Sequence, residues 1–210
     1  MGIEERKERE KKMRRQQIMD AAKKVFASNG FGCATVENIA EEAELSPATL
    51  YLYFKNKDEL FASLNLKMLE ALIAKMESVR DQGNLSPEKK IKELQKALYE
   101  LYLTDPLNVV NVLRFQSKER LKNLSPELAS RIKNYTKKYM KAISEIFEDG
   151  VREGTFLDRH PAAFADTVWG LFAGLVLLED TKKGLRQGKD LLEPTLELAL
   201  EIISRGIKKR

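Results

Sequence analysis

The chain has 210 residues, 43% hydrophobic and 33% charged, with a formal net charge of +5, which describes a soluble globular protein whose outer faces are highly charged. One cysteine excludes an internal disulfide framework, and together with one histidine it leaves no cluster of metal ligands, so we expect neither a metal nor a cofactor. The longest apolar run, Val168 to Leu178, is too short to span a bilayer and the charged N-terminus lacks a secretory signal, so we expect a cytoplasmic protein without a membrane partner.

Residues 1–17 form a charged N-terminal arm with seven Lys or Arg, four Glu and almost no apolar side chains. Two interpretations of this arm stay open. It is a solvated helical extension, or it is a basic arm that lies near DNA phosphates or in a minor groove. The cations on which the second interpretation depends are Lys11, Lys12, Arg14 and Arg15.

A first helix is predicted over 14–28, because apolar residues recur there at the spacing of one helix face. These residues are Ile18, Ala21, Ala22, Val25 and Phe26. Asn29 and Gly30 then supply a left-handed stop.

Two short helices separated by a turn are predicted next. Thr35 is placed as the N-cap of the first. Ser46 is placed as the N-cap of the second, in which Pro47 occupies the first helical position. Leu50 and Phe54 lie four residues apart and face inward together, which leaves small polar and tyrosine side chains toward solvent. This pattern describes a helix-turn-helix, and an ordinary pair of antiparallel helices in a bundle is the alternative.

Six prolines each follow a residue that can cap or precede a helix, so each marks a helix start. With three further starts that lack proline, the sequence predicts about nine helices and an all-α fold, since no stretch shows the alternation typical of a strand. The predicted limits are 14–28, 35–42, 47–53, 57–80, 87–103, 107–121, 126–152, 161–183 and 194–207.

The last two predicted helices carry more apolar surface than one core-facing stripe requires. Helix 161–183 is apolar on every face, and helix 194–207 is apolar on two adjoining faces. A homodimeric four-helix interface accounts for this surface, and a single-chain bundle is the alternative. The expected interface residues are Gly170, Gly174, Val176, Leu196, Leu200 and Ile203.

Residues 35–60 resemble the DNA-binding region of TetR-type (tetracycline-repressor-like) transcriptional regulators. The resemblance implies a DNA-binding helix-turn-helix domain with its charged arm over 1–56, and a larger helical domain for ligand binding and dimerisation over 57–210. The matching residues are Thr35, Ile39, Ala40, Ala43, Leu45, Ser46, Leu50, Tyr51, Tyr53, Phe54, Lys57 and Leu60.

By this resemblance the second helix of the motif enters the major groove with its N-terminal end first. Base edges are implied to lie nearest Ser46, Pro47, Ala48 and Thr49. Pro47 and Ala48 offer only apolar contact, for instance to a thymine methyl group. Phosphate contacts are implied for Thr35, Ser46, Thr49, Tyr51, Tyr53 and Lys57.

Two features distinguish this motif from a basic DNA-reading helix. Between Thr35 and Phe54 there is no Lys or Arg and there are four Glu, so affinity must depend on hydroxyl groups, helix N-termini and flanking cations. Glu44 stands in the turn where the family usually has Gly, so the turn either avoids a positive φ or accepts modest strain.

The resemblance also implies a small-molecule site in the larger domain. Its candidate residues are mostly apolar and aromatic, which favours a hydrophobic effector such as an acyl chain, and plain core packing is the alternative for each of them. Arg114 is the polar candidate for an anionic ligand. The candidates are Leu72, Tyr99, Tyr102, Val109, Leu113, Arg114, Phe115, Phe147, Trp169 and Phe172.

The sequence contains no Gly-rich phosphate loop and no Gly-x-Ser-x-Gly elbow, so we expect no enzyme and assign no catalytic residue. The preferred hypothesis is a homodimeric transcriptional repressor that binds a palindromic double-stranded DNA operator and is released by a small effector. One alternative is an architectural DNA-binding protein that uses no ligand. The other is a helical small-molecule-binding bundle with a vestigial DNA-binding motif.

Overall fold

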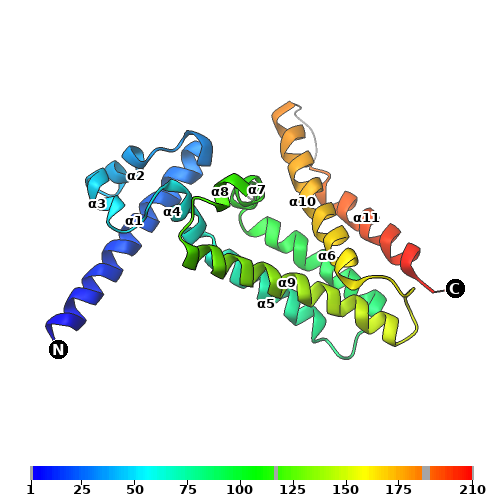
Figure 1. Ribbon diagram of the computed structural model, residues 1–210. Helices are drawn as coiled ribbons and strands as arrows, with labels where there is room; N and C mark the ends of the chain where they lie inside the picture. Colours follow the sequence, from blue (N-terminus) through cyan, green and yellow to red (C-terminus); the bar gives the residue numbers. More distant parts are fainter. Residues whose placement is uncertain (1, 116–117, 186–189, 210) are drawn as a thin grey trace. The chain divides into compact units, whose positions relative to one another are not determined.

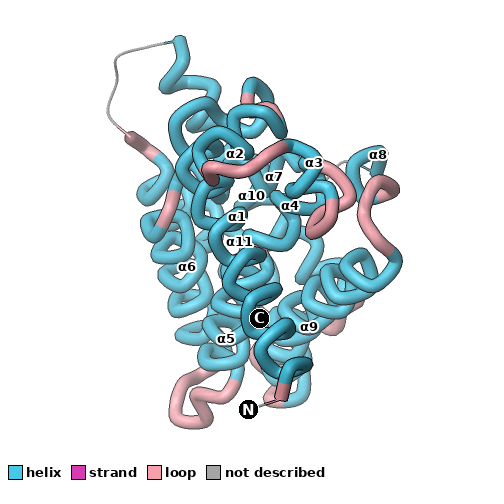
Figure 2. Tube along the Cα trace, turned by 90° about the vertical axis from the view of Figure 1, so that its left-hand side faces the viewer, coloured by secondary structure: helices cyan, strands magenta, loops and turns pink. Residues whose placement is uncertain are grey.

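A computed structural model of the chain describes residues 2–115, 118–185 and 190–209. Within these ranges the chain forms helices joined by loops and contains no β-strand (Figure 1 and Figure 2). The all-α fold predicted from the sequence is confirmed. The helices are α1 Ile3–Cys33, α2 Val36–Glu42, α3 Pro47–Tyr51, α4 Lys57–Leu64, α5 Leu66–Arg80, α6 Pro87–Thr104, α7 Pro106–Phe115, α8 Lys118–Leu121, α9 Pro126–Arg152, α10 Pro161–Leu185 and α11 Leu192–Ile207.

Two of the nine predicted helices correspond to two segments each. The predicted helix 57–80 is divided at Asn65, whose side-chain amide donates to the carbonyl oxygen of Phe61 at 2.8 Å. That carbonyl also accepts the backbone N–H of Asn65, so the side chain competes for a helical acceptor at the division. The predicted helix 107–121 corresponds to α7 and α8, on either side of two residues outside the described ranges.

Proline begins most of the helices that it was predicted to begin. Pro194 is the exception, because α11 starts two residues earlier, at Leu192. A proline in the first turn is tolerated there, since the N–H groups of that turn have no intrahelical acceptor. The prolines that stand at the first helical position are Pro47, Pro87, Pro106, Pro126 and Pro161.

The first helix is longer at both ends than predicted. It begins at Ile3, so the charged arm is helical and continues directly into the predicted segment. At the other end Gly30 has φ 70° and ψ 161°, a conformation that produces a kink, and the helix resumes to Cys33. The predicted stop at Gly30 is therefore a bend.

The chain forms two compact units. Unit 1 comprises Met1–Lys67 and Arg114–Arg131, and unit 2 comprises Met68–Leu113 and Ile132–Arg210. The functional division that the family resemblance implies after residue 56 stays a prediction. The compact units have different bounds, because residues 114–131 belong to the same unit as the N-terminal segment.

Unit 1 is a small bundle around the apolar face of α1. Ile18 and Ala22 are fully buried on that face, where α1 lies against α2 and α4. Because the buried residues recur at the spacing predicted from the sequence, the inward face of α1 is confirmed. The other buried residues of this core include Ile39, Ala40, Ala43, Leu50, Phe54, Leu60 and Phe61.

Unit 2 is a larger bundle in which α11 packs beside both α6 and α10 (Figure 1). Its core is continuous and contains buried apolar side chains from each of its long helices. The fully buried members include Leu72, Met76, Leu94, Leu98, Ile146, Phe147, Phe172, Val176 and Leu196.

Helix α10 is the most apolar element of the described chain. Over Pro161–Lys183 it is long and apolar enough, by length and composition, to cross a membrane, so the eleven-residue run Val168 to Leu178 understated its apolar extent. A core helix of a soluble protein passes the same test, and one such helix is weak evidence for a span. Only 28% of its most apolar window is buried within the chain. Helix α10 therefore presents a large apolar surface that this single chain does not cover.

Candidate nucleic-acid interface

Helices α2 and α3 form the helix-turn-helix predicted from the sequence. Thr35 caps α2, with its hydroxyl accepting from the backbone N–H of Asn38 at 3.1 Å. Ser46 caps α3, with its hydroxyl accepting from the backbone N–H of Thr49 at 3.1 Å and lying 2.8 Å from the Thr49 hydroxyl. Both caps satisfy orphan donors at a helix start, so they fix where each helix begins.

Helix α3 presents its N-terminal end and one side to solvent. Ser46, Pro47 and Ala48 are exposed and Thr49 is half-buried, whereas Leu50 is buried beneath them. Tyr51 is 54% exposed, and Tyr53 is half-buried. Of the side chains implied to contact DNA, those of Ser46, Pro47, Ala48 and Tyr51 thus lie on the accessible end and side of α3, which is anchored through Leu50.

Leu52, directly after α3, is 80% exposed, and the sequence pattern did not predict a role for it. A leucine this accessible, next to Tyr51 and Tyr53, enlarges the exposed surface at the end of α3 with an apolar contact. The sequence could have indicated this exposure, because Leu52 does not share the inward helix face of Leu50 and Phe54.

The turn between α2 and α3 accepts a left-handed residue. Glu44 has φ 54°, the only positive φ of a residue other than glycine in the described chain. Its backbone N–H bonds to the carbonyl oxygen of Glu41 at 3.0 Å, and the N–H of Leu45 bonds to that of Ala40 at 2.9 Å. Of the two outcomes expected for Glu44, the strained one is observed, and it costs roughly 1–2 kcal/mol relative to glycine.

Two polar side chains of α1 donate hydrogen bonds to backbone carbonyl oxygens of the helix-turn-helix. Gln17 donates its amide N–H to the carbonyl oxygen of Ala43 at 2.8 Å, at the end of α2. Arg15 donates to the carbonyl oxygen of Tyr53 at 3.2 Å, and its guanidinium lies over the ring of Phe54, 4.2 Å from the centroid. Burial lowers the pKa of Arg15, which is therefore an inward-facing anchor and no part of a solvated basic arm.

Lys57 also faces inward. Its ammonium donates to the carbonyl oxygens of Phe31 at 2.9 Å and Ala34 at 2.7 Å, and it lies 4.6 Å from the centroid of the Phe31 ring. Burial lowers the pKa of this half-buried lysine. Two of its three N–H donors are thus committed to the last turn of α1 and to the residue that follows it, and one is left for a phosphate.

Phe115, expected in a ligand pocket, packs instead in unit 1. Its ring lies 5.6 Å from that of Phe31 and 5.1 Å from that of Phe61, centroid to centroid, and the guanidinium of Arg120 lies 4.6 Å from the Phe31 centroid. Phe26 completes this aromatic cluster, at 5.5 Å from Phe31. The linear pattern of α7 does not reveal this packing, because residues 114–131 belong to the same compact unit as the N-terminal segment.

The other ligand candidates divide between core and edge. Tyr99, Leu113 and Trp169 are half-buried against the core of unit 2. Arg114 is exposed and belongs to unit 1, so it does not line the core of unit 2. The candidates that are buried members of that core are Leu72, Tyr102, Val109, Phe147 and Phe172.

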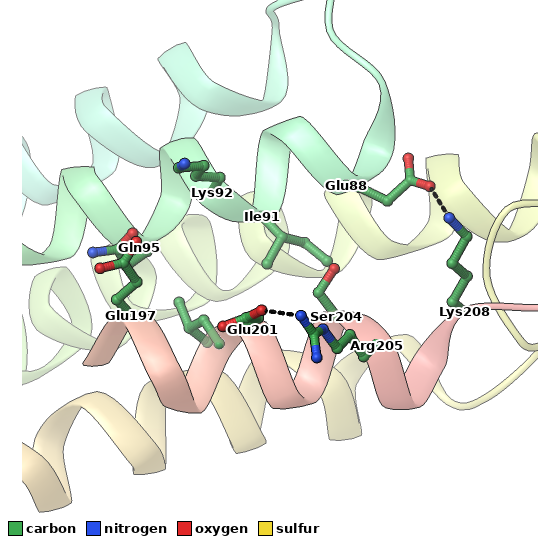
Figure 3. Close-up of a pocket in the computed structure, with 10 residues that line it drawn as sticks. Glu88, Ile91, Lys92, Gln95, Glu197, Glu201, Ser204, Arg205 and Lys208 are labelled. Carbon is green, nitrogen blue, oxygen red and sulfur yellow. Dashed lines mark ion pairs between the residues drawn. The ribbon is translucent and has the colours of Figure 1, made fainter. Parts of the chain in front are cut away.

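A half-open groove of about 450 Å³ runs between α6 and α11 in unit 2, and its lining includes none of the ligand candidates. Ile91 lies in the groove, and ion pairs join Glu88 to Lys208 at 3.5 Å and Glu201 to Arg205 at 2.5 Å (Figure 3). Because the lining contains three Glu and three Lys or Arg side chains, the groove has no net charge that would attract an ion of either sign.

The expected dimer residues are only partly accessible. Val176, Leu196 and Leu200 are buried in the core of unit 2, so their assignment to an interface is corrected to the core of their own subunit. Ile203 is half-buried beside that core. Gly170 and Gly174 are exposed, with open space where a side chain would stand. Sequence periodicity could not decide which of the two apolar faces of these helices points inward.

Three apolar side chains on α10 and α11 are exposed instead. Leu178 is 48% exposed, Leu198 57% and Ile202 62%. Leu198 and Ile202 stand four residues apart on α11, so they share one face of that helix. Across the described residues no group of three or more His, Cys, Asp or Glu side chains is placed to hold a metal ion.

Comparison with known proteins agrees with this geometry. The family model described as bacterial regulatory proteins, tetR family, matches residues 18–64, which span α1 to α4. The chain is similar to a fatty acid metabolism regulator protein of Bacillus subtilis, with 31% identity over 146 residues that cover 70% of this chain and 72% of the relative. It is also similar to the transcriptional repressor KstR2 of Mycolicibacterium smegmatis, with 27% identity over 161 residues that cover 74% of this chain and 76% of the repressor.

A solved structure has the same fold. It is FadR of Bacillus subtilis in complex with stearoyl-CoA, which matches with a TM-score of 0.70 at 24% identity and covers 91% of this chain and 98% of FadR. The match at 31% identity, together with the family model over the helix-turn-helix, is specific in sequence as well as in fold. The chain therefore belongs to the tetR family of bacterial regulatory proteins and is a DNA-binding transcriptional regulator.

Proposed function

We propose that the protein is a homodimeric repressor whose α3 helices read a palindromic operator and whose affinity for DNA falls when a fatty acyl thioester binds. The observation that carries the DNA-binding part is the accessible N-terminal end of α3, capped by Ser46 above the buried Leu50. A helix that offers its first turn to solvent while its other face is anchored is suited to enter a major groove.

The proposed DNA contacts rely on hydroxyl groups and helix starts. Tyr51 and Tyr53 are the phosphate ligands beside α3, and Thr35 offers a third hydroxyl at the start of α2. Pro47 and Ala48 supply apolar contact to base edges. The backbone N–H groups at the starts of α2 and α3 add the partial positive charge that favours a phosphate.

The effector class rests on relatives and on the composition of unit 2. One relative is named for fatty acid metabolism, and one structural neighbour was solved with stearoyl-CoA. The core of unit 2 is built from leucine, isoleucine, methionine and aromatic side chains, which suit an acyl chain. Burying each methylene group of such a chain contributes about 0.8 kcal/mol, so a long chain supplies the binding energy that drives release.

The proposed dimer uses the uncovered apolar surface of α10 and α11. Leu178, Leu198 and Ile202 are the exposed contacts, and Gly170 and Gly174 allow a partner helix to approach closely. A two-fold dimer presents two α3 helices, so it matches two half-sites about one helical turn of DNA apart, or a multiple of that spacing. A partner subunit on this surface, and no lipid bilayer, accounts for the apolar character of α10.

The proposal is completed by a cytoplasmic location and by the absence of catalysis. The homologues are transcriptional regulators, and the proposed work of this chain is binding alone, with its ligand acting as a signal and not as a substrate. In this view the ligand changes the populations of DNA-binding and released states by its difference in affinity for the two.

Selection of bound DNA from a random duplex pool tests this proposal. The expected result is enrichment of one inverted repeat, and elution of the enriched duplexes by stearoyl-CoA but not by free coenzyme A. Enrichment without any elution by acyl thioesters of several lengths would favour an architectural DNA-binding protein. Failure to enrich any sequence would contradict the DNA-reading role of α3.

A further inference from the structure

The exposed half of α1 forms a second charged surface next to the helix-turn-helix. We propose that this surface holds the sugar-phosphate backbone of the operator where it continues past Tyr53, so that each subunit grips DNA with α3 and with the outer face of α1. The inference rests on the proposed function, because it needs an operator, and it adds a backbone site outside the motif.

The surface is a groove of about 680 Å³ between α1 and Tyr53, which lies two residues beyond the end of α3. Lys7, Lys11 and Arg14 line it from α1, and Tyr53 lines it from the motif. The three cations recur at i, i+4 and i+7, so they form one stripe along a single face of the helix. Because Tyr53 is also a proposed phosphate ligand of the motif, a backbone strand held by Tyr53 enters a groove walled by cations.

The negative charge in the groove is already compensated. Glu10 lines it, and its carboxylate accepts from the guanidinium of Arg6 at 2.9 Å. Over residues 1–17 there are seven Lys or Arg and four Glu, a net charge of +3, whereas residues 35–54 contain four Glu and no Lys or Arg. The cations that the motif lacks are therefore supplied by α1.

Hydrogen bonds also fix the position of the cation-bearing face of α1 relative to the motif. Arg14 donates to the side-chain oxygen of Gln17 at 2.9 Å, and Gln17 donates to the carbonyl oxygen of Ala43 at 2.8 Å, at the end of α2. Arg15, the residue after Arg14, donates to the carbonyl oxygen of Tyr53. These bonds fix the stripe against α2 and the end of α3, so its cations are presented on a rigid helix rather than on a loose arm.

The length of the exposed helix defines its reach. Residues 3–14 are exposed throughout, and no apolar side chain in that stretch is buried, so packing does not explain why the helix extends so far (Figure 1). At about 1.5 Å per residue these twelve residues span about 18 Å, which corresponds to about five base pairs of duplex at about 3.4 Å each. The arm is long enough to follow several phosphates of one strand.

A matched pair of double variants tests the inference. Lys7→Ala with Lys11→Ala removes two cations from the groove. Arg9→Ala with Lys12→Ala removes two exposed cations from the opposite side of the same helix, with the same change in net charge. Both variants retain the buried face of α1, so circular dichroism and thermal unfolding are expected to match those of the unaltered protein.

The readout is the salt dependence of operator affinity, measured by fluorescence anisotropy of a labelled operator. Each phosphate contact made by a cation contributes about 0.9 to the slope of log K against log salt. The Lys7/Lys11 variant lacks two cations in each subunit and four in the dimer, so it is expected to lose about 3.6 from that slope and to bind more than about tenfold more weakly at 0.1 M salt. The Arg9/Lys12 variant is expected to keep the slope of the unaltered protein. Hydroxyl-radical footprinting is expected to show that the Lys7/Lys11 variant loses protection of about five backbone positions beside each half-site.

Equal slopes and equal footprints for the two variants would overturn the inference and leave a solvated helical extension, while operator binding by the unaltered protein would still support the proposed function. Failure of the unaltered protein to bind any selected duplex would overturn both. A loss of slope in both variants would also overturn the groove, because it would show a general effect of charge.

Discussion

The ammonium of Lys57 donates a hydrogen bond to the carbonyl oxygen of Ala34 at 2.7 Å. This bond ties the first residue of α4 to the residue that follows α1, and the same ammonium also bonds to the carbonyl oxygen of Phe31. Among the described hydrogen bonds, no other cation donates to these two carbonyl oxygens. Lys57 therefore holds the end of α1 and the start of the helix-turn-helix in place.

Lys57→Ala is expected to lower the free energy of unfolding by about 1–3 kcal/mol, because two carbonyl oxygens lose a charged donor. Lys55→Ala is the control, since the side chain of Lys55 is exposed and has no hydrogen bond or ion pair in the described structure. Urea unfolding followed by circular dichroism measures both. Equal unfolding midpoints for the two variants would show that Lys57 serves DNA contact alone.

Glu44→Gly is expected to stabilise the protein by about 1 kcal/mol, because glycine adopts the observed φ of 54° without strain and this gain exceeds the entropy that glycine adds to the unfolded chain. Glu41→Gly, in the last turn of α2, is expected to have the opposite sign, a loss of about 1 kcal/mol. Thermal unfolding of the two variants measures both changes in stability. A destabilised Glu44→Gly protein would mean that the carboxylate makes a contribution larger than the strain.

Tyr51→Phe is expected to weaken operator binding by about 1 kcal/mol for each subunit of the dimer. The salt slope is expected to stay the same, because a contact between a neutral hydroxyl and a phosphate releases no counterion. Tyr51 is 54% exposed, so the unfolding midpoint is expected to stay the same. Tyr135→Phe is the control in unit 2, where its hydroxyl bonds to Glu70 at 2.6 Å. If both variants bind the operator as tightly as the parent, the proposed role of Tyr51 is wrong.

Leu198→Asp combined with Ile202→Asp is expected to convert the dimer to a monomer, because two charges would be buried in an apolar interface without partners. Leu103→Asp combined with Leu107→Asp is the control, since these leucines are comparably exposed at 54% and 62% on other helices of unit 2. Sedimentation equilibrium measures the mass of each. A dimer that survives the first pair of changes would place the interface elsewhere.

Helix limits and cap residues were largely predictable because they depend on local chemistry. Ser46 and Pro47 mark the start of α3 whatever the rest of the chain does, and the same holds for most of the proline-marked starts. Thr35 caps α2 as expected, with the added return bond from its backbone N–H to the Asn38 side chain.

Non-local partners were not predictable. The two carbonyls that hold Lys57 lie 23 and 26 residues away along the chain, and nothing in the pattern around Lys57 distinguishes a buried anchor from a phosphate ligand. Phe115 belongs to unit 1 because residues 114–131 fold back to the N-terminal segment. On α10 every face is apolar, so periodicity could not separate the core residue Val176 from the exposed Leu178.

The arm illustrates the same limit. Its composition left a solvated helix and a DNA-binding arm both open, and four cations were candidates for the second role. The structure separates these cations, since Lys11 and Arg14 line the groove beside Tyr53 while Arg15 faces inward against Phe54. Which cation faces which way depends on the helical register of α1, and that register is visible only once the whole arm is helical.

In the proposed mechanism, one acyl thioester controls the affinity of this dimer for its operator. Fluorescence anisotropy of the selected operator, titrated with protein in the presence and absence of stearoyl-CoA, tests it most directly. The Kd for DNA is expected to rise at least about tenfold with ligand, a coupling of about 1.4 kcal/mol, whereas free coenzyme A is expected to have no such effect. An unchanged Kd at saturating stearoyl-CoA and with shorter acyl thioesters would contradict it.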